Sequence, residues 1–171
     1  WLRHAAYPVT IDPNFGYETV GASTNSDTQS NAWRGATYTA PADVSTADSI
    51  TGYYWKNTGT SGVKGMLVNA SHQIVTNGIG NAVTVGTTQT WYTSPFATSP
   101  SLSPSTDYII SFVKEAANGS KYDTGSTNQG HYETDNNYAS PTNPSGDTES
   151  TDKLSIYLTY TAAAAPASES I

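Results

Sequence analysis

The chain has 171 residues, a formal net charge of −7 and no cysteine. Its seven Lys and Arg residues are scattered, so the sequence lacks the basic cluster with which proteins bind nucleic acids or anionic membrane surfaces. Without cysteine there is no disulfide framework and no thiolate metal site, and without a run of about 18 apolar residues we expect no insertion into a bilayer.

Aromatic and hydroxyl side chains dominate the composition. Trp, Tyr and Phe together number 19, whereas only 12% of the residues are charged, and Ser and Thr make up more than a quarter of the chain. Tyr and Thr favour strands, while Ser, Gly, Asn and Pro favour turns. A chain this rich in aromatic residues is not disordered over most of its length. We expect one β-rich domain with an extracellular location, and because Trp1 is not an initiator Met we expect a processed or excised chain.

The first half of the chain reads as short strands between polar turns. We expect strands at 7–11, 33–39, 49–56, 63–69 and 72–76. The first of these contains Pro8, which suits an edge strand or a strand added to another molecule. The last two are separated by a tight connection and predict a hairpin.

The second half continues this pattern. Segments 82–85 and 89–93 predict a further pair around Gly86, and 107–114 predicts a buried strand. Asn118-Gly119 is a turn signal from which 120–124 returns. The segment 125–149 is polar and irregular. In 153–161 apolar residues alternate, which predicts that Leu154, Ile156, Leu158 and Tyr160 share one face.

Roughly nine or ten short strands spaced about ten residues apart predict an all-β fold with almost no helix. The expected architecture is a two-sheet antiparallel β-sandwich, jelly-roll-like or immunoglobulin-like. We divide the chain into an extended N-terminal arm or junction at 1–16, the β-sandwich domain at 17–161 and a C-terminal tail at 162–171.

Three short motifs support this fold. They are RGATYTAP at 34–41, SIT at 49–51 with VKG at 63–65, and Trp91 with LSPSTDY at 102–108. Together they resemble a widespread group of secreted prokaryotic jelly-roll modules. The resemblance implies a module of a surface protein or a neighbour of a glycan-active enzyme, and it implies carbohydrate binding. The chain departs from the group at Ser105-Thr106, where glycine is usual. Residues 7–13 also resemble a junction in large secreted proteins, which implies the end of a longer precursor.

Groups that perform catalysis are sparse, and we expect no enzyme. The acidic residues available for a carboxylate pair are Asp123, Glu133, Asp135, Asp147 and Glu149. All but Asp123 lie in a polar loop, where solvation explains them. A G-x-S-x-G elbow does not occur. His4, His72 and His131 are far apart in sequence and lack HExxH-type spacing, so the sequence predicts no zinc site and an exposed His72.

No cofactor is expected, although calcium stays open. Calcium binds carboxylates and carbonyls in loops without a strict motif. Asp43 with Asp48, or Asp147 with Asp152, could contribute ligands, and the alternative interpretation is surface acids in turns.

Sugars or partner proteins would be bound by exposed aromatic rings. Tyr53, Tyr54 and Trp55 are consecutive, so they must point to both faces of a sheet. The candidate binding residues are Trp55, Trp91, Tyr92, Tyr122, Tyr132 and Tyr138. Packing within the sandwich is the alternative for each, and exposed Tyr also suits protein–protein contacts.

Two sequons, at Asn69 and Asn118, lie at predicted turns and are candidate glycosylation sites. Subunit contact is expected from the N-terminal segment, because Tyr7, Val9 and Ile11 could add a strand to a neighbour's sheet edge. The predicted function is a non-enzymatic extracellular module, a structural or adhesive subunit of a cell-surface or fibre-like assembly that associates through its terminal segments. The alternative is a carbohydrate-binding module of a secreted glycan-active protein.

Overall fold

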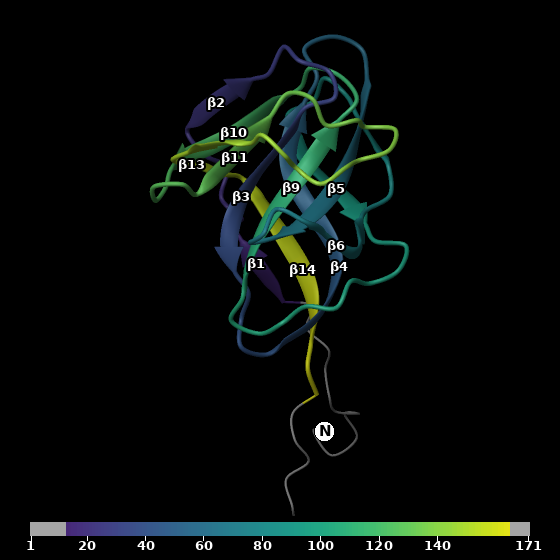
Figure 1. Ribbon diagram of the computed structural model, residues 1–171. Helices are drawn as coiled ribbons and strands as arrows, with labels where there is room; N and C mark the ends of the chain where they lie inside the picture. The colour runs from purple at the N-terminus through teal and green to yellow at the C-terminus, as the bar shows by residue number, and fades with distance from the viewer. Residues whose placement is uncertain (1–12, 165–171) are drawn as a thin grey trace, which may run out of the picture.

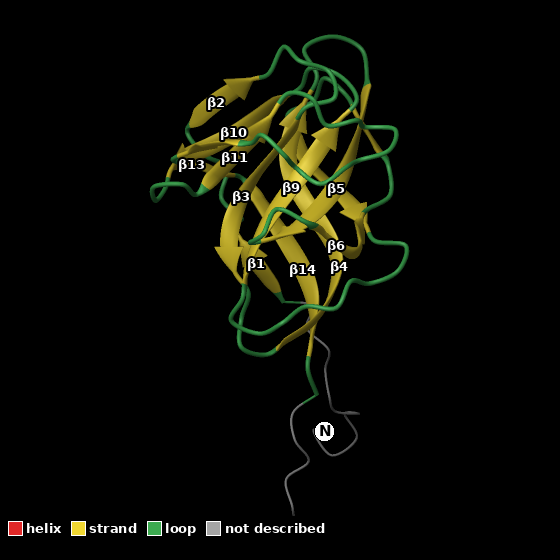
Figure 2. Ribbon diagram, viewed as in Figure 1, coloured by secondary structure: helices red, strands yellow, loops and turns green. Residues whose placement is uncertain are grey.

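The structure, a computed structural model, describes residues 13–164. Over those residues the chain forms 14 strands and no helix. The strands form two antiparallel sheets of seven strands that lie face to face (Figures 1 and 2). The predicted two-sheet β-sandwich is therefore confirmed, with more strands than the nine or ten expected. No helix within 13–164 offers the length and apolar character needed to cross a membrane.

Sheet 1 contains both ends of the described chain. Its strands are β1 (Asn14–Gly16), β2 (Ser23–Ser26), β4 (Val44–Trp55), β8 (Thr90–Pro95), β10 (Gly119–Thr124), β13 (Asp152–Leu154) and β14 (Ile156–Ala162). The order is β1-β14-β4-β10-β13, with β2 also paired to β10 and β8 to β4.

Sheet 2 is built around the apolar strand β9. Its strands are β3 (Trp33–Thr39), β5 (Ser61–Asn69), β6 (Ile74–Ile79), β7 (Val83–Val85), β9 (Asp107–Lys114), β11 (Gly130–Glu133) and β12 (Thr148–Ser150). The order is β12-β11-β3-β9-β5-β6, and β7 pairs with β5. The expected strands 33–39 and 107–114 coincide with β3 and β9.

The main core lies between the sheets and follows the expected alternation. Leu154, Ile156, Leu158 and Tyr160 are all buried in it, although Ser155 separates β13 from β14. Burial of each such side chain contributes about 1.5–3 kcal/mol. The period-2 pattern at the end of the chain therefore identified both the strand face and the core.

A second apolar cluster lies on the outer face of sheet 2. It consists of Trp33, Met66, Val68, Ile109 and Val113. The loop 134–147, between β11 and β12, crosses this face in front of β9 and β5 (Figure 1) and packs Tyr138 against the cluster. Sheet 2 is thus covered on both faces, which explains why β9 is buried from Tyr108 to Lys114.

Two expected pairings are wrong. Segments 82–85 and 89–93 form strands, but β7 pairs with β5 in sheet 2 whereas β8 pairs with β4 in sheet 1. Asn118-Gly119 does not close a hairpin either, because β9 belongs to sheet 2 and β10 to sheet 1. Turn residues determine where a chain bends, but they do not determine which sheet receives the next strand.

The polar segment 125–149 is also more regular than expected, because β11 lies within it and β12 begins there. These strands form without apolar alternation because β11 pairs with β3 through four consecutive residues.

The backbone conformation at Ser105 is the one for which glycine is usual at this position in the modules that the chain resembles. The φ of Ser105 is 53°, in the left-handed region that glycine adopts at no steric cost. The turn forms with serine at this position, and the Ser105 amide donates a hydrogen bond to the carbonyl of Ala40 at 3.1 Å.

The terminal segments are described only in part. Asn14–Gly16, which we placed in the arm, form β1 and pair with β14, so the sandwich begins before residue 17. The expected contact residues Tyr7, Val9 and Ile11, and residues 165–171 of the tail, lie outside the described residues.

Candidate functional site

Trp55 is not a binding platform. This residue is only 7% exposed. It pairs with Gly119 of β10, and a Cβ atom on Gly119 would collide with the indole ring of Trp55. Tyr54 is buried as well, so two consecutive side chains of β4 are covered. Alternation sends them to opposite faces, but at this end of β4 both faces are covered.

Trp91 does lie on the outer face of sheet 1, within a row of three aromatic rings. The Trp91 ring centroid is 5.4 Å from that of Tyr53 on β4 and 5.4 Å from that of Tyr157 on β14. All three side chains are half-buried. The planes cross at 82° and 56°, so the rings do not form one flat platform. Tyr157 was not identified from the sequence.

The remaining candidate tyrosines are engaged by the protein itself. Tyr92 and Tyr122 pack against the main core. The Arg34 guanidinium lies 4.4 Å from the ring centroid of Tyr132, and Lys64 Nζ lies 4.6 Å from that of Tyr138. These cation–π contacts occupy ring faces that we expected to be open to a ligand.

The two sequons differ in their surroundings. Asn69 is half-buried, and its Oδ1 accepts hydrogen bonds from the amides of Ser71 (2.9 Å) and Gln73 (3.0 Å). Asn118 is 2% exposed, so its amide is covered in the folded chain and the expected exposed turn is wrong there.

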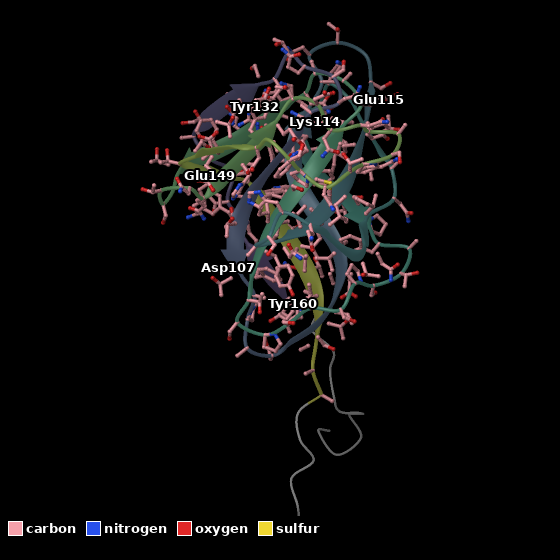
Figure 3. The ribbon with its side chains drawn as sticks, viewed as in Figure 1. Asp107, Lys114, Glu115, Tyr132, Glu149 and Tyr160 are labelled. Atoms are coloured by element: carbon pink, nitrogen blue, oxygen red, sulfur yellow. The ribbon has the colours of Figure 1, made fainter. Side chains whose placement is uncertain are left out.

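A buried charge cluster connects β3, β9 and β13 to the loop after β2. The Asp27 carboxylate accepts hydrogen bonds from Arg34 (Nη2–Oδ1, 2.7 Å) and from Lys114, which is fully buried. Arg34 Nη1 also lies 3.2 Å from Asp152 Oδ2. Figure 3 shows Lys114 and Tyr132 at one end of the sandwich, with Tyr160 toward the other.

The two ionised partners in this cluster respond to burial differently. Burial alone would raise the pKa of Asp27, but the hydrogen bond from Arg34 and the positive charges of Lys114 and Arg34 lower it. Burial lowers the pKa of Lys114 to about 8, although Asp27 opposes that shift. Asp147 and Asp152, one of the two expected calcium pairs, do not lie together, because Asp152 belongs to this cluster and Asp147 does not. In the other expected pair, Asp43 accepts from Tyr160 and Asp48 from Thr161.

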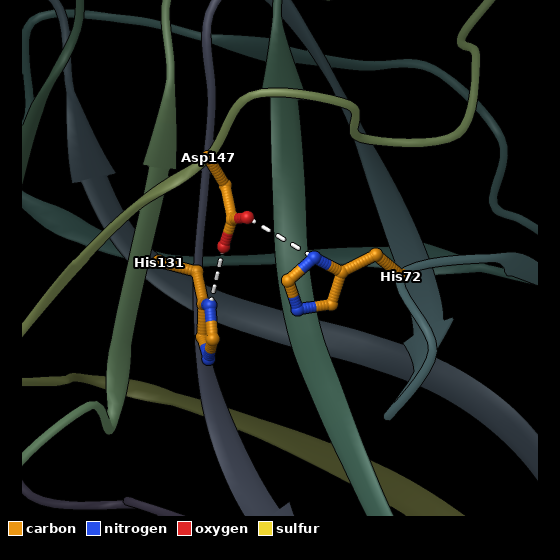
Figure 4. A group of neighbouring side chains, drawn as sticks. All are labelled: His72, His131 and Asp147. Carbon is orange, nitrogen blue, oxygen red and sulfur yellow. Dashed lines mark hydrogen bonds and ion pairs between the residues drawn. The ribbon is translucent and has the colours of Figure 1, made fainter.

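A histidine–aspartate cluster (His72, His131 and Asp147) lies on the outer side of sheet 2 (Figure 4). Asp147 Oδ2 is 2.7 Å from His131 Nδ1, and Asp147 Oδ1 is 3.1 Å from His72 Nδ1. One potential ligand atom from each residue lies within 4.8 Å of the other two. Folding therefore brings together two histidines, His72 and His131, that are far apart in sequence, which spacing alone did not predict.

Three different local structures position these side chains. His131 is central in β11, buried and stacked on Trp33 with centroids 6.3 Å apart. His72 lies in the turn between β5 and β6 with φ 58°, and it is half-buried rather than exposed. Asp147 ends the loop 134–147, which Glu133 holds by accepting from the amides of Ser145 (3.1 Å) and Gly146 (3.0 Å).

The second nitrogen of His131 faces Thr37, with Nε2 2.8 Å from Thr37 Oγ1. Thr37, His131 and Asp147 thus have the order and spacing of a nucleophile, base and orienting acid. The Thr37 amide, however, donates to the carbonyl of Gln129 at 2.7 Å, so it is not free to stabilise an oxyanion. The contact with Thr37 orients the ring of His131.

A cavity of about 170 Å³ adjoins the cluster and is lined in part by His72 and His131. The carboxylates of Asp107 and Glu149 also line it. The cluster therefore combines two imidazoles and a shared carboxylate, which is a set of groups able to bind a cation.

No family model and no curated protein matches this chain. Among solved structures it is similar to a clostridial cysteine protease, Cwp84, after propeptide cleavage. The TM-score is 0.61 at 12% sequence identity, and the match covers 88% of this chain and 40% of that protein. The chain thus spans less than half the length of its neighbour, and the likeness is one of fold.

Proposed function

We propose that this chain is a non-enzymatic extracellular module that serves as a structural or adhesive subunit of a cell-surface or fibre-like assembly. The observation that carries the proposal is the aromatic row of Tyr53, Trp91 and Tyr157 on the outer face of sheet 1. Aromatic residues are enriched at protein interfaces, and charged residues are depleted at their centres. A contact through this row would remove water from rings and hydroxyls, which costs less free energy than removing water from charged groups.

The crossed orientation of the three rings favours a protein partner. Rings inclined by 82° and 56° form an uneven surface, which suits the side chains of another chain better than the flat face of a sugar. A second copy is the partner we propose, and the terminal segment with Tyr7, Val9 and Ile11 would extend the contact by pairing with an open sheet edge.

Sedimentation velocity of the full chain, from micromolar to near-millimolar concentration, tests this proposal. We expect reversible self-association whose dissociation constant rises about tenfold or more in Trp91→Ala, because truncating a central interface Trp costs about 2 kcal/mol or more. Trp91→Phe keeps a ring and should retain most of the association. Val20→Ser changes an exposed apolar residue (43% exposed) outside the row and should have no effect.

A chain that stays monomeric throughout, or a Trp91→Ala variant that associates as the parent does, overturns the proposal. Deleting residues 1–12 tests the terminal contact separately. If deletion leaves association unchanged while Trp91→Ala weakens it, the aromatic row is the interface and the terminal strand is not.

Carbohydrate binding is the second candidate function, and Trp91 is the observation that favours it. The half-buried indole lies two residues from the exposed Thr93 on β8, so one ring face and a nearby hydroxyl could contact a pyranose. A broad glycan array with Trp91→Ala as control tests it. Saturable binding that the substitution abolishes supports this function, and the absence of any binding rejects it.

A further inference from the structure

We propose that His72, His131 and Asp147 bind a divalent zinc-class ion that joins the loop 134–147 and the β5–β6 turn to sheet 2. Each ligand comes from one of these parts: the turn supplies His72, strand β11 supplies His131, and the loop supplies Asp147. An ion held by all three would therefore restrain two loops against the outer face of the sheet. This role is independent of the proposed adhesive function.

The distances suit zinc. Zinc bonds of about 2.0–2.1 Å in tetrahedral geometry place neighbouring ligand atoms roughly 3.3 Å apart. The two imidazole nitrogens lie 2.7 Å and 3.1 Å from different oxygens of Asp147, Oδ2 and Oδ1. Binding through one of these oxygens therefore requires the carboxylate to turn and the contacts to open as the ion replaces the hydrogen-bonding protons. The cavity lined by His72 and His131 lies beside the two imidazoles, and water would complete a tetrahedral set as the fourth ligand.

The groups around the ligands also suit a metal. When Nδ1 of His131 binds an ion, its proton resides on Nε2, and Thr37 Oγ1 at 2.8 Å is placed to accept it. Such a partner fixes the tautomer and orientation of a ligating imidazole. Two imidazoles and one carboxylate favour zinc over calcium, which prefers six to eight oxygen ligands.

The turn between β5 and β6 positions His72. The φ of His72, 58°, is the left-handed conformation that this tight turn requires. The turn is held there by Asn69, whose carbonyl accepts the His72 amide at 2.9 Å and whose side chain caps the next amides. The turn thus holds the residue whose side chain reaches Asp147.

The test is zinc titration of the full chain after treatment with a chelator and dialysis. Calorimetry should show one zinc per chain. At zinc concentrations 100 times the dissociation constant, the midpoint of thermal unfolding should rise by about 5–10 °C. Calcium at the same concentration should produce neither effect. Hydrogen exchange in 134–147 should slow when zinc is added.

His72→Asn is the most informative variant, because asparagine tolerates the left-handed backbone and the zinc-free protein should fold as the parent does. We expect this variant and Asp147→Asn to lose zinc binding by at least 100-fold. Asp48→Asn removes a carboxylate bonded to Thr161, outside the cluster, and should bind zinc normally. Cobalt should give the intense absorption of a tetrahedral ion in the parent only.

Three results overturn the proposal. The first is the absence of zinc binding, which would leave the cluster as a hydrogen-bonded network. The second is equal binding by the parent and His72→Asn. The third is a cobalt spectrum of an octahedral hydrated ion, which would identify an adventitious surface ion.

Discussion

The buried charge cluster offers the most quantitative test of the structure, through Asp27→Asn. This isosteric change leaves Lys114 and Arg34 without the carboxylate that they share. Side chains of Asp27, Lys114 and Arg34 are only 5%, 0% and 11% exposed, so water does not replace it. Breaking a buried pair from one side costs about 3–5 kcal/mol, whereas an exposed pair costs about 0–1 kcal/mol.

The expected loss is a large part of the stability of the domain. Domains unfold at a cost of about 5–15 kcal/mol, and for a chain of this size each kcal/mol shifts the unfolding midpoint by about 2–4 °C. We therefore expect the midpoint to fall by roughly 6–20 °C. Adding Lys114→Met to Asp27→Asn removes one uncompensated cation and should recover about 2 kcal/mol or more.

Urea unfolding followed by tryptophan fluorescence is the assay, because guanidinium is itself a salt and would screen the charges. The four combinations of parent, two single variants and the double variant form a cycle that isolates the coupling between Asp27 and Lys114. Asp48→Asn is the matched control and should cost less than about 1 kcal/mol. A loss below about 1 kcal/mol for Asp27→Asn, or a double variant less stable than Asp27→Asn alone, would refute the reasoning.

Three further predictions concern local strain, unpaired amides and acid. Ser105→Gly should raise the free energy of unfolding by about 1 kcal/mol by relieving the positive φ, whereas Thr106→Gly should lower it; a lower melting temperature for Ser105→Gly would contradict this. Asn118→Leu should stabilise the fold by up to about 1 kcal/mol, because neither polar atom of the buried Asn118 amide has a partner among the described residues; a destabilised variant would show an unrecognised partner. Because the pKa values of Asp27 and Glu133 are lowered by hydrogen bonds that outweigh burial, the folded chain keeps these carboxylates ionised at pH values where the unfolded chain binds protons. Their stabilisation is present above the unfolded values near pH 4 and is lost as pH falls through the lower folded values. Thermal unfolding from pH 7 to pH 2 should show a shallower loss in Asp27→Asn, and equal slopes would be inconsistent with this role.

The strands that carry apolar alternation were predictable from the sequence, and those defined by pairing alone were not. Trp33–Thr39 and Asp107–Lys114 carry enough apolar and β-branched residues to be assigned locally. By contrast, β11 and β12 are polar, and they exist because β3 offers an edge to pair with. Local sequence specifies the face of a strand, but the order of strands depends on contacts between residues distant in sequence.

The histidine–aspartate cluster could not be predicted for the same reason, because it depends on contacts between residues distant in sequence. His72 and His131 lie on a turn and a strand with no motif between them, so spacing rules written for helices and zinc knuckles did not apply. Two signals were available: a histidine directly after Asn69-Ala70-Ser71, where a turn requires a special backbone conformation, and a histidine within otherwise polar sequence. Neither signal indicates that Asp147 joins them, because that depends on the path of the loop 134–147.

The few basic residues in the described part of the chain contribute to contacts within the molecule. All six Lys and Arg residues between 13 and 164 make contacts within the chain. Those contacts are Arg34 and Lys114 with Asp27, Lys56 with the Ala117 carbonyl, Lys64 with Tyr138, Lys121 with Thr24 and Lys153 with Tyr17. Tyr132 and Tyr138, two tyrosines in polar sequence, therefore make cation–π contacts within the chain. Tyr53, Trp91 and Tyr157, on the outer face of sheet 1, pack against one another. A partner that buries this row would displace little bound charge, so its affinity should depend on ring contacts and only weakly on salt.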